Sequence, residues 1–170
     1  LKERYDVIRE FPEVVALAIG TRPDCVADEV LDLASSYADA YEVWMEYGVQ
    51  SLQDRTLALI NRGHTAAVTL EAIRRTRERG VLNVCAHLIV GLPGEGEAEY
   101  VATARALARS DIQGVKFHPL RVVRGTALEA WYRDGRYEAL TCSDYARGVV
   151  TMLECLPPTV VIERLTADCP

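Results

Sequence analysis

Short apolar runs alternate with amphipathic helical segments along the whole chain, and this alternation limits the folds available to it. The starts of the runs lie roughly 30 to 45 residues apart, which is the scale of a βαβ unit. Most runs are continuously apolar, as strands are when both faces of a parallel sheet are covered. The pattern predicts an α/β fold with a parallel sheet and helices outside it. The runs lie at residues 14–19, 43–49, 83–90, 114–120 and 160–165.

Helices are expected between these runs because apolar residues recur there at helical spacing. Asp28, Thr65 and Ser143 are plausible N-caps, and Gly80 fits the residue just past a helix C-terminus. Four arginines of one expected helix are placed on its solvated side, namely Arg74, Arg75, Arg77 and Arg79. The expected helices lie at residues 28–37, 55–60, 65–79, 97–110, 127–134 and 143–156.

Five strands are too few to close a barrel of TIM type, because such a barrel has eight strands and about 250 residues. An open, partial (β/α) barrel with parallel strands is therefore predicted. The chain has 170 residues, of which 49% are hydrophobic, and these supply a sizeable core. We expect residues 1–170 to form a single domain.

Charge and cysteine content narrow the function classes. The net charge of −6 makes nucleic acid an unexpected partner. No apolar run approaches the roughly 18 residues of a membrane span, and the charged segment at residues 1–10 does not read as a signal peptide. The scattered cysteines favour a reduced, cytoplasmic protein with no metal site of its own. These cysteines are Cys25, Cys85, Cys142, Cys155 and Cys169.

Polar residues interrupt the apolar runs at alternating positions. Alternate residues of a strand point to the same face, so these side chains converge if their faces all line the concave side of the sheet. Burying so many polar groups costs free energy unless they pair with one another or meet a ligand. Convergent ionisable groups mark a candidate site. The set comprises Glu46, Gln50, His87, Lys116, His118 and Arg164.

Ordinary structural roles remain open for the same residues. They are a core histidine for His87, an internal ion pair for Glu46 and Lys116, a helix cap for Gln50 and a surface position for Arg62. The glycines Gly91 and Gly94 resemble a phosphate-binding loop only weakly, since neither GxxxxGK[ST] nor GxGxxG is present.

Five short motifs occur in order along the chain. They are GTRPDC, EYGVQS, INRGHT, HLIVGLPGE and KFHPL. Together they resemble the radical S-adenosylmethionine (radical SAM) superfamily, in particular an uncharacterised bacterial subfamily related to the Elongator catalytic subunit and to oxygen-independent coproporphyrinogen III oxidase. The resemblance covers residues 14–168. It implies a partial (β/α)6 barrel, of which this chain holds about strands 3 to 6 and a C-terminal extension.

The resemblance also implies a function. Such an enzyme cleaves S-adenosylmethionine (SAM) reductively with a [4Fe-4S] cluster and starts radical chemistry on a substrate, which is unknown here. A reductant such as flavodoxin or ferredoxin is the implied partner. The cofactor supplies the chemistry, while the protein positions it and excludes water.

Residue roles follow from the same resemblance. Gln50 matches a contact to the ribose or methionyl part of SAM, Arg62 one to its carboxylate, His87 a ribose-binding Asp of relatives, and Leu120 a backbone position that pairs with the adenine. A guanidinium binds a carboxylate in a bidentate fashion, which suits the role given to Arg62. Gly20 stands where relatives carry a Glu, and a histidine at position 87 brings no fixed negative charge. Glu46, Lys116 and His118 are left as candidate catalytic residues.

The cluster-binding cysteines of the family, spaced as CxxxCxxC, are not in this sequence. The glycine-rich methionine-binding segment of the family is not in it either. We therefore expect the chain to be the C-terminal part of a radical SAM protein and to be inactive alone. An exposed sheet edge near Val14 is expected to promote self-association.

Two other classes of function stay open. A Schiff-base lyase or aldolase-like barrel would use Lys116 as its nucleophile and Glu46 or His118 as the acid–base group. A non-catalytic scaffold or interaction module is the third possibility.

Overall fold

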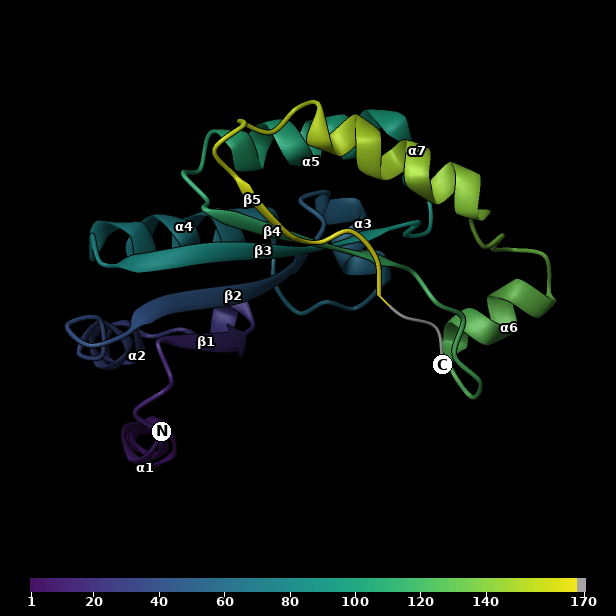
Figure 1. The fold of residues 1–170 in the computed structure, drawn as a ribbon. Coiled ribbons are helices and arrows are strands. Elements are labelled where there is room, and N and C mark those ends of the chain that lie inside the picture. Colours follow the sequence, from purple (N-terminus) through teal and green to yellow (C-terminus); the bar gives the residue numbers. More distant parts are fainter. Residues whose placement is uncertain (168–170) are drawn as a thin grey trace.

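Five parallel strands form one open sheet in the computed structural model, which describes residues 1–167. Each strand pairs in parallel with the strand that follows it in the chain. The expected open, parallel α/β sheet is thereby confirmed (Figure 1). Asp168 and Cys169 lie outside the described residues. The strands are β1 (Ala16–Thr21), β2 (Glu42–Gln50), β3 (Leu82–Val90), β4 (Gly114–Pro119) and β5 (Val161–Arg164).

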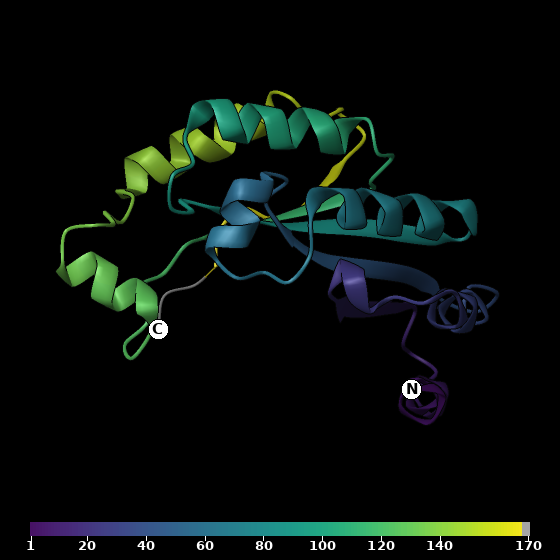
Figure 2. The same ribbon diagram turned by 180° about the vertical axis from the view of Figure 1, so that it is seen from behind.

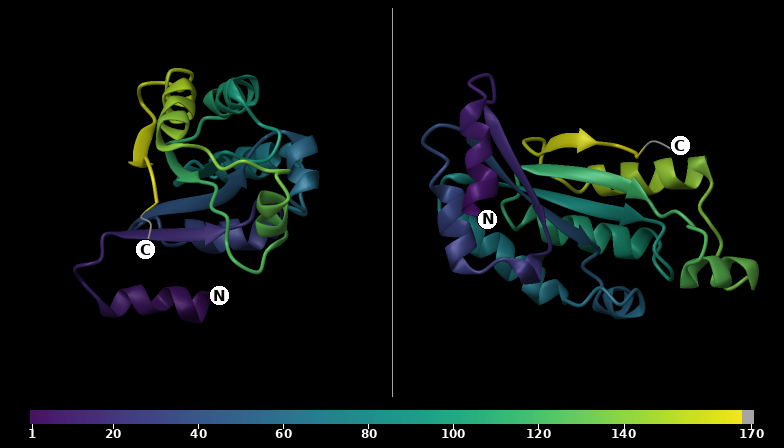
Figure 3. Two further views of the ribbon diagram at one scale, coloured as in Figure 1. Left: turned by 90° about the vertical axis from the view of Figure 1, so that its right-hand side faces the viewer. Right: turned by 90° about the horizontal axis from the view of Figure 1, so that it is seen from below.

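Helices cover one face of this sheet. Figures 1 and 2 view the molecule from opposite sides and place α3, α4 and α5 on the same face. Figure 3 shows the same layering from the side and places α1 at the β1 end of the sheet. The helices are α1 (Lys2–Tyr5), α2 (Asp28–Ser35), α3 (Asp54–Leu59), α4 (Ala66–Glu78), α5 (Glu97–Ala108), α6 (Ala127–Arg133) and α7 (Cys142–Leu153), with short 3₁₀ segments at Asp6–Glu10 and Pro23–Cys25.

The core lies between the sheet and these helices. Side chains of β2 alternate, so that Val43, Met45, Tyr47 and Val49 are buried while the residues between them are only partly buried. The hydroxyl groups of Tyr47 and Thr76 hydrogen-bond at 2.7 Å and join β2 to α4. Within residues 1–167, the opposite face of the sheet has no such helical layer, so the expectation that both faces are covered holds for one face only.

Helix ends test the expected caps. Thr65 caps α4 by accepting a hydrogen bond from the Val68 amide at 3.4 Å, and Gly80 has φ +74° just past the helix, so both predictions are confirmed. The other two caps were predicted wrongly. Ala27 is the N-cap of α2, which leaves the Asp28 carboxylate free to pair elsewhere. Thr141, not Ser143, caps α7.

The arginines of α4 are less solvated than their pattern predicted. Arg74 has 56% of its side chain exposed, but Arg75, Arg77 and Arg79 have only 21 to 25%. These three lie on the flanks of the helix, where acidic residues of neighbouring segments reach them. The pairs are Arg75–Asp28, Arg77–Asp111, Arg79–Asp28 and Arg79–Asp32.

Both edges of the sheet carry short strands. In the described part of the chain, β1 pairs only with β2, so the exposed edge expected near Val14 lies along residues 16–21.

No helix among residues 1–167 has the length and apolar character needed to cross a membrane.

Candidate functional site

A carboxylate on the open face of the sheet lies at the centre of the polar residues. Glu46, in the middle of β2, contacts two neighbouring strands. Its Oε1 accepts a hydrogen bond from Lys116 Nζ on β4 at 2.6 Å, and its Oε2 lies 2.9 Å from His87 Nε2 on β3. The parallel register brings these three side chains together, as strand parity predicted. The internal ion pair between Glu46 and Lys116 is therefore present.

A second carboxylate completes the cluster, and it was not expected. Glu163 Oε2 lies 3.0 Å from Lys116 Nζ. Gly114 pairs with Val161 and Val115 with Ile162, so Glu163 shares the face of Gly114 and Lys116. The register then shifts and makes Arg164 the backbone partner of Lys116, but the lysine ammonium contacts Glu163. Arg164 is exposed, which corrects the prediction that it is an interior residue. The register between two strands cannot be read from a single sequence, so the contact between Glu163 and Lys116 could not be predicted.

His118 joins the cluster through His87. Their rings stack with centroids 5.6 Å apart and an interplanar angle of 28°. His87 keeps 25% of its side chain exposed, compared with 14% for both Glu46 and Lys116. The cluster is thus most buried at the ion pair and opens toward the histidines.

The protonation states of the cluster follow from these contacts. Burial alone would raise the pKa of Glu46 and lower that of Lys116, but their mutual hydrogen bond and charges reverse both shifts. Burial lowers the pKa of His87 and of His118. At neutral pH, Glu46 is therefore a carboxylate, Lys116 an ammonium and both histidines are neutral.

Two further predicted residues meet above a glycine of the same strand. Arg62 donates a hydrogen bond from Nη2 to the Gly48 carbonyl oxygen at 2.5 Å. A Cβ at position 48 would lie 2.6 Å from Arg62 Nη2 and 2.9 Å from Gln50 Nε2. Glycine therefore leaves room for both side chains. Gln50 does not cap the next helix, whose N-cap is Gln53.

Arg62 retains an unused donor. Its Nε is buried and has no hydrogen-bond partner among the described residues. Burial, together with the charge of Arg22, lowers the pKa of Arg62. Buried polar groups in proteins are nearly always paired, so the Arg62 Nε lacks a partner that the described residues do not supply. Arg62 is half-buried, which makes a fully exposed surface position incorrect for it.

His64, close to Arg62 in the sequence, also has a buried ring nitrogen without a hydrogen-bond partner among the described residues. His64, from the INRGHT motif, is 8% exposed and its Nε2 has no partner among residues 1–167. Its Nδ1 lies 3.3 Å from Thr69 Oγ1 on α4. His64 was not predicted as a site residue, although its motif was singled out.

Leu120 lies at the end of β4, away from the ion pair. Its amide donates to the Val90 carbonyl oxygen at 3.0 Å, so only its carbonyl oxygen can serve a ligand through the backbone. Leu120 also lines a cavity of about 650 Å³ beside α6, together with Arg121 and Tyr132. The predicted adenine-side position therefore borders an open space.

The glycine-rich loop after β3 does not form a phosphate cradle. Both backbone groups of Gly91 are used, because Tyr100 Oη accepts from its amide at 3.1 Å and Tyr137 Oη donates to its carbonyl oxygen at 3.0 Å. Gly91 has φ +99°, a conformation that favours glycine. The loop is a packed turn, and phosphate binding there is not supported.

The cysteines do not form a cluster site in the described part of the chain. Cys85 is buried on β3, and burial raises the pKa of its thiol. Residues 1–167 contain no group of three or more His, Cys, Asp or Glu side chains arranged to hold a metal ion. Iron–sulfur clusters need closely placed thiolates, so these residues do not fit as ligands of a [4Fe-4S] cluster.

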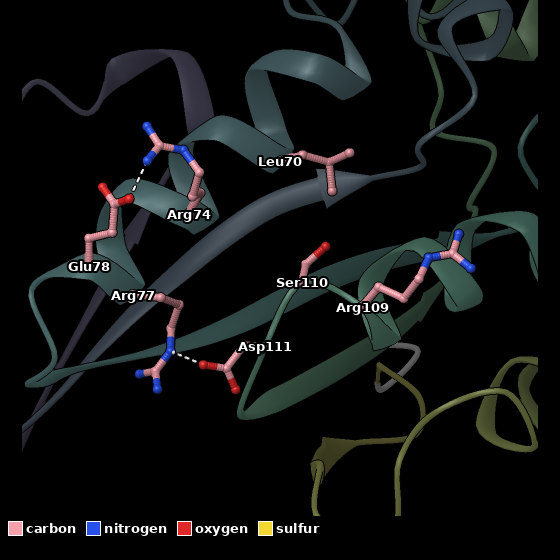
Figure 4. Close-up of a pocket in the computed structure, with 7 residues that line it drawn as sticks. All are labelled: Leu70, Arg74, Arg77, Glu78, Arg109, Ser110 and Asp111. Atoms are coloured by element: carbon pink, nitrogen blue, oxygen red, sulfur yellow. Dashed lines mark hydrogen bonds and ion pairs between the residues drawn. The ribbon is translucent and has the colours of Figure 1, made fainter.

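A separate cavity of about 440 Å³ lies between α4 and the end of α5 (Figure 4). Arg74 pairs with Glu78 on its rim, and Arg77 pairs with Asp111. The cavity lies at the helical layer, so it is separate from the cluster of ionisable side chains around Glu46 on the open face of the sheet.

Comparisons with known proteins identify the family of the chain. The model of the radical SAM superfamily matches residues 1–107, and that of the radical SAM C-terminal domain matches residues 112–170. The uncharacterized protein MJ0486 of Methanocaldococcus jannaschii is 43% identical over 99% of this chain and 52% of its own length. Protein YhcC of Escherichia coli is 42% identical over 99% of this chain and 54% of its own length. The chain thus spans about half the length of these relatives.

Solved structures show the same fold. Elp3 of the archaeon Methanocaldococcus infernus superposes with a TM-score of 0.80 at 27% identity, over 92% of this chain and 36% of that one. Coproporphyrinogen III oxidase (HemN) of E. coli, a radical SAM enzyme, superposes with a TM-score of 0.63 over 89% of this chain and 34% of that one; at 16% identity this likeness concerns the fold alone. From the matching family model and the relatives at more than 40% identity, we conclude that the chain belongs to the radical SAM superfamily.

Proposed function

We propose that this chain is the C-terminal part of a radical SAM enzyme and supplies one side of its SAM site. When bound, SAM and a [4Fe-4S] cluster supply the radical chemistry of the superfamily. The relatives are about twice as long as this chain, which leaves room for cluster ligands outside it. The described residues contribute orientation, charge and shielding from water.

One observation carries the SAM proposal, namely the meeting of Gln50 and Arg62 above Gly48. A guanidinium with a free, buried Nε suits a carboxylate such as that of the methionyl group. Gln50 offers an amide donor and acceptor beside it. Leu120 borders the cavity at the end of β4, where an adenine would meet its backbone.

His87 has a different role from the acidic residue of relatives. Its Nε2 is committed to Glu46, so it holds that carboxylate in place and offers a ligand its ring face or its Nδ1. We place Glu46, Lys116 and His118 on the substrate side of the site. Neutral His118 can accept a proton and, once protonated, return it, while the Glu46–Lys116 pair fixes the local charge.

The lysine geometry argues against a Schiff-base enzyme. Such a nucleophile must be a neutral amine with a lowered pKa. Two carboxylates contact Lys116, and their hydrogen bonds raise its pKa in spite of burial. Lys116 is therefore assigned an electrostatic role.

The proposal is tested on the full-length polypeptide that carries this chain. After anaerobic reconstitution with iron and sulfide, addition of SAM and a reductant such as flavodoxin or dithionite should yield 5′-deoxyadenosine. Arg62→Ala and Gln50→Ala should each weaken SAM binding by about tenfold, the worth of one good hydrogen bond to a charged or polar group. The exposed Arg105→Ala on α5 is the control. Absence of both a cluster spectrum and 5′-deoxyadenosine would contradict the proposal.

Self-association through the β1 edge is a second part of the proposal. The strand exposes unpaired backbone groups along residues 16–21 in the isolated chain. Light scattering of the 170-residue chain should show species larger than a monomer. A monodisperse monomer across a range of concentrations contradicts this expectation.

A further inference from the structure

The turn that presents Gln50 is strained. Gln50 has φ +66°, and the amide of the next residue, Ser51, donates to the Val49 carbonyl oxygen at 2.9 Å. A hydrogen bond that spans two residues around a positive φ defines a tight γ-turn of a rare type. A non-glycine residue in this region costs about 1–3 kcal/mol and persists only where its surroundings enforce it. The neighbourhood of Gln50 must therefore contain the groups that hold this turn.

Ser51 holds the turn in place through hydrogen bonds of its hydroxyl group. It is 1% exposed, and its hydroxyl donates to the Glu95 carboxylate. The same Oγ accepts from the Gln53 amide at 3.0 Å. Leu52 is held by Thr103 Oγ1 of α5 at 3.3 Å. Each residue that follows Gln50 is thus fixed by a named polar partner.

Glu95 comes from a different loop, the GLPGE turn after β3. Burial raises the pKa of its carboxyl group, against the opposing hydrogen bonds from Ser51 and Thr56. Arg55, at the start of α3, donates from Nη2 to the Gly94 carbonyl oxygen at 3.3 Å. Two loops that are 44 residues apart in sequence are therefore tied together at one side chain.

We infer that Glu95 is a positioning residue, which holds Gln50 in its strained conformation through Ser51 so that the Gln50 amide meets the SAM site. The inference rests on the proposed role of Gln50. Glu95 does not itself reach the ligand, since its carboxylate is used by Ser51 and Thr56. It also explains why a glutamate closes a loop that does not bind phosphate.

Conservative and disruptive variants separate positioning from simple stability. Glu95→Gln keeps a carbonyl oxygen that can accept from the Ser51 hydroxyl, whereas Glu95→Ala removes it. Measured by calorimetry on the full-length polypeptide with SAM, Glu95→Ala should weaken binding by about tenfold, since one buried hydrogen-bond group is left unpaired. Glu95→Gln should stay within about twofold of wild type. Exposed Glu97→Ala, two residues away, is the matched control.

A second readout needs no ligand. Hydrogen exchange at the Ser51 amide reports the γ-turn directly, and it should accelerate in Glu95→Ala but not in Glu95→Gln or Glu97→Ala. The double variant Gln50→Ala/Glu95→Ala should bind SAM no more weakly than Gln50→Ala alone, because both act through the same contact.

The outcomes separate the proposed SAM contact of Gln50 from the proposed positioning role of Glu95. If Gln50→Ala weakens binding while Glu95→Ala changes neither affinity nor exchange, the positioning role is wrong and the SAM site stands. If wild type does not bind SAM, or Gln50→Ala has no effect, the proposed SAM contact is wrong. Exchange at Ser51 then still decides whether Glu95 holds the turn.

Discussion

Two sets of ion pairs in this molecule look alike in sequence but differ in setting. One is the open-face cluster, which consists of Glu46, His87, Lys116, His118 and Glu163. The other is the arginine row of α4, which consists of Arg75, Arg77 and Arg79 with their acidic partners. Lys116 and Glu46 each expose 14% of their side chains, whereas Asp28 and Asp111 expose 61% and 73%.

The difference in exposure between the two sets indicates which ion pairs have a structural role only. Exposed pairs are worth little individually, because water and salt screen them and ordering the side chains costs entropy. A charge pair of which both members are mostly buried, as Glu46 and Lys116 are, must be well paired to be tolerated, and such pairs cluster at functional sites. The ion pairs of the arginine row therefore hold α4 against α2 and the loop after α5. We propose that the catalytic residues lie in the open-face cluster instead.

The largest expected effect is from Lys116→Met. This change leaves two carboxylates, Glu46 and Glu163, facing each other without their cation. We expect a loss of about 2 kcal/mol in the free energy of unfolding, below the full value of a buried pair because one face is open. Urea denaturation of the chain measures it. The double variant Lys116→Met/Glu46→Gln should recover part of the loss, and an unchanged midpoint in the single variant would contradict the assignment.

Gly48→Ala tests whether the open face keeps space for a ligand site. The new methyl group would meet the ends of the Arg62 and Gln50 side chains, both of which can swing away. Stability should change little, whereas affinity for SAM should fall by about fivefold, which corresponds to about 1 kcal/mol. Gly20→Ala is the control, because a Cβ there meets no atom within 4 Å. Equal effects of the two variants on affinity would contradict the prediction.

The pH dependence of stability comes next in size. Burial lowers the folded-state pKa of His64, His87 and His118. The folded state therefore resists protons that the unfolded state takes up, so stability is complete above pH 6.5 and falls as the pH drops below it. The lowered pKa of Glu46 adds a second decline below pH 4.5. His118→Gln should flatten the first decline in denaturant titrations between pH 7 and pH 5, and an identical profile would argue against a buried, neutral His118.

The smallest effect is expected at Arg74, the more exposed arginine of α4 next to the arginine row. Arg74 pairs with Glu71 and Glu78 on the exposed side of α4. Arg74→Gln should leave the unfolding midpoint within experimental scatter, and high salt should not change this result. A shift comparable to that of Lys116→Met would show that exposure does not separate the two sets.

The sequence predicted much of the site through strand parity. Glu46, His87 and Lys116 lie on adjacent parallel strands, and the period of two placed them on one face without knowledge of the structure. Strand parity and the motif resemblance both pointed to Gln50, and the resemblance gave Arg62 its role; the structure brings the two together above Gly48. Their roles toward a ligand remain proposals.

Local spacing could not predict the partners of single side chains. Asp28 has the residue type of an N-cap, yet helix α2 begins one residue earlier and its carboxylate pairs with Arg75 and Arg79 of α4. The same limit applies to Ser143, whose expected cap is made by Thr141. Such choices depend on which groups reach a side chain through space.

The alternation of apolar runs and helical segments determined the parallel sheet, because each run must bury itself against a helix and only a crossover returns the chain in parallel. Tertiary structure alone decided which carboxylate faces Lys116, since only the pairing of β4 with β5 brings Glu163 to the lysine ammonium. It also decided the tie between Ser51 and Glu95, because that contact joins two loops that neighbour each other only after the strands have paired. Hydrophobic periodicity is a local property of the chain, whereas register and loop contacts are set by the free energy of the whole fold.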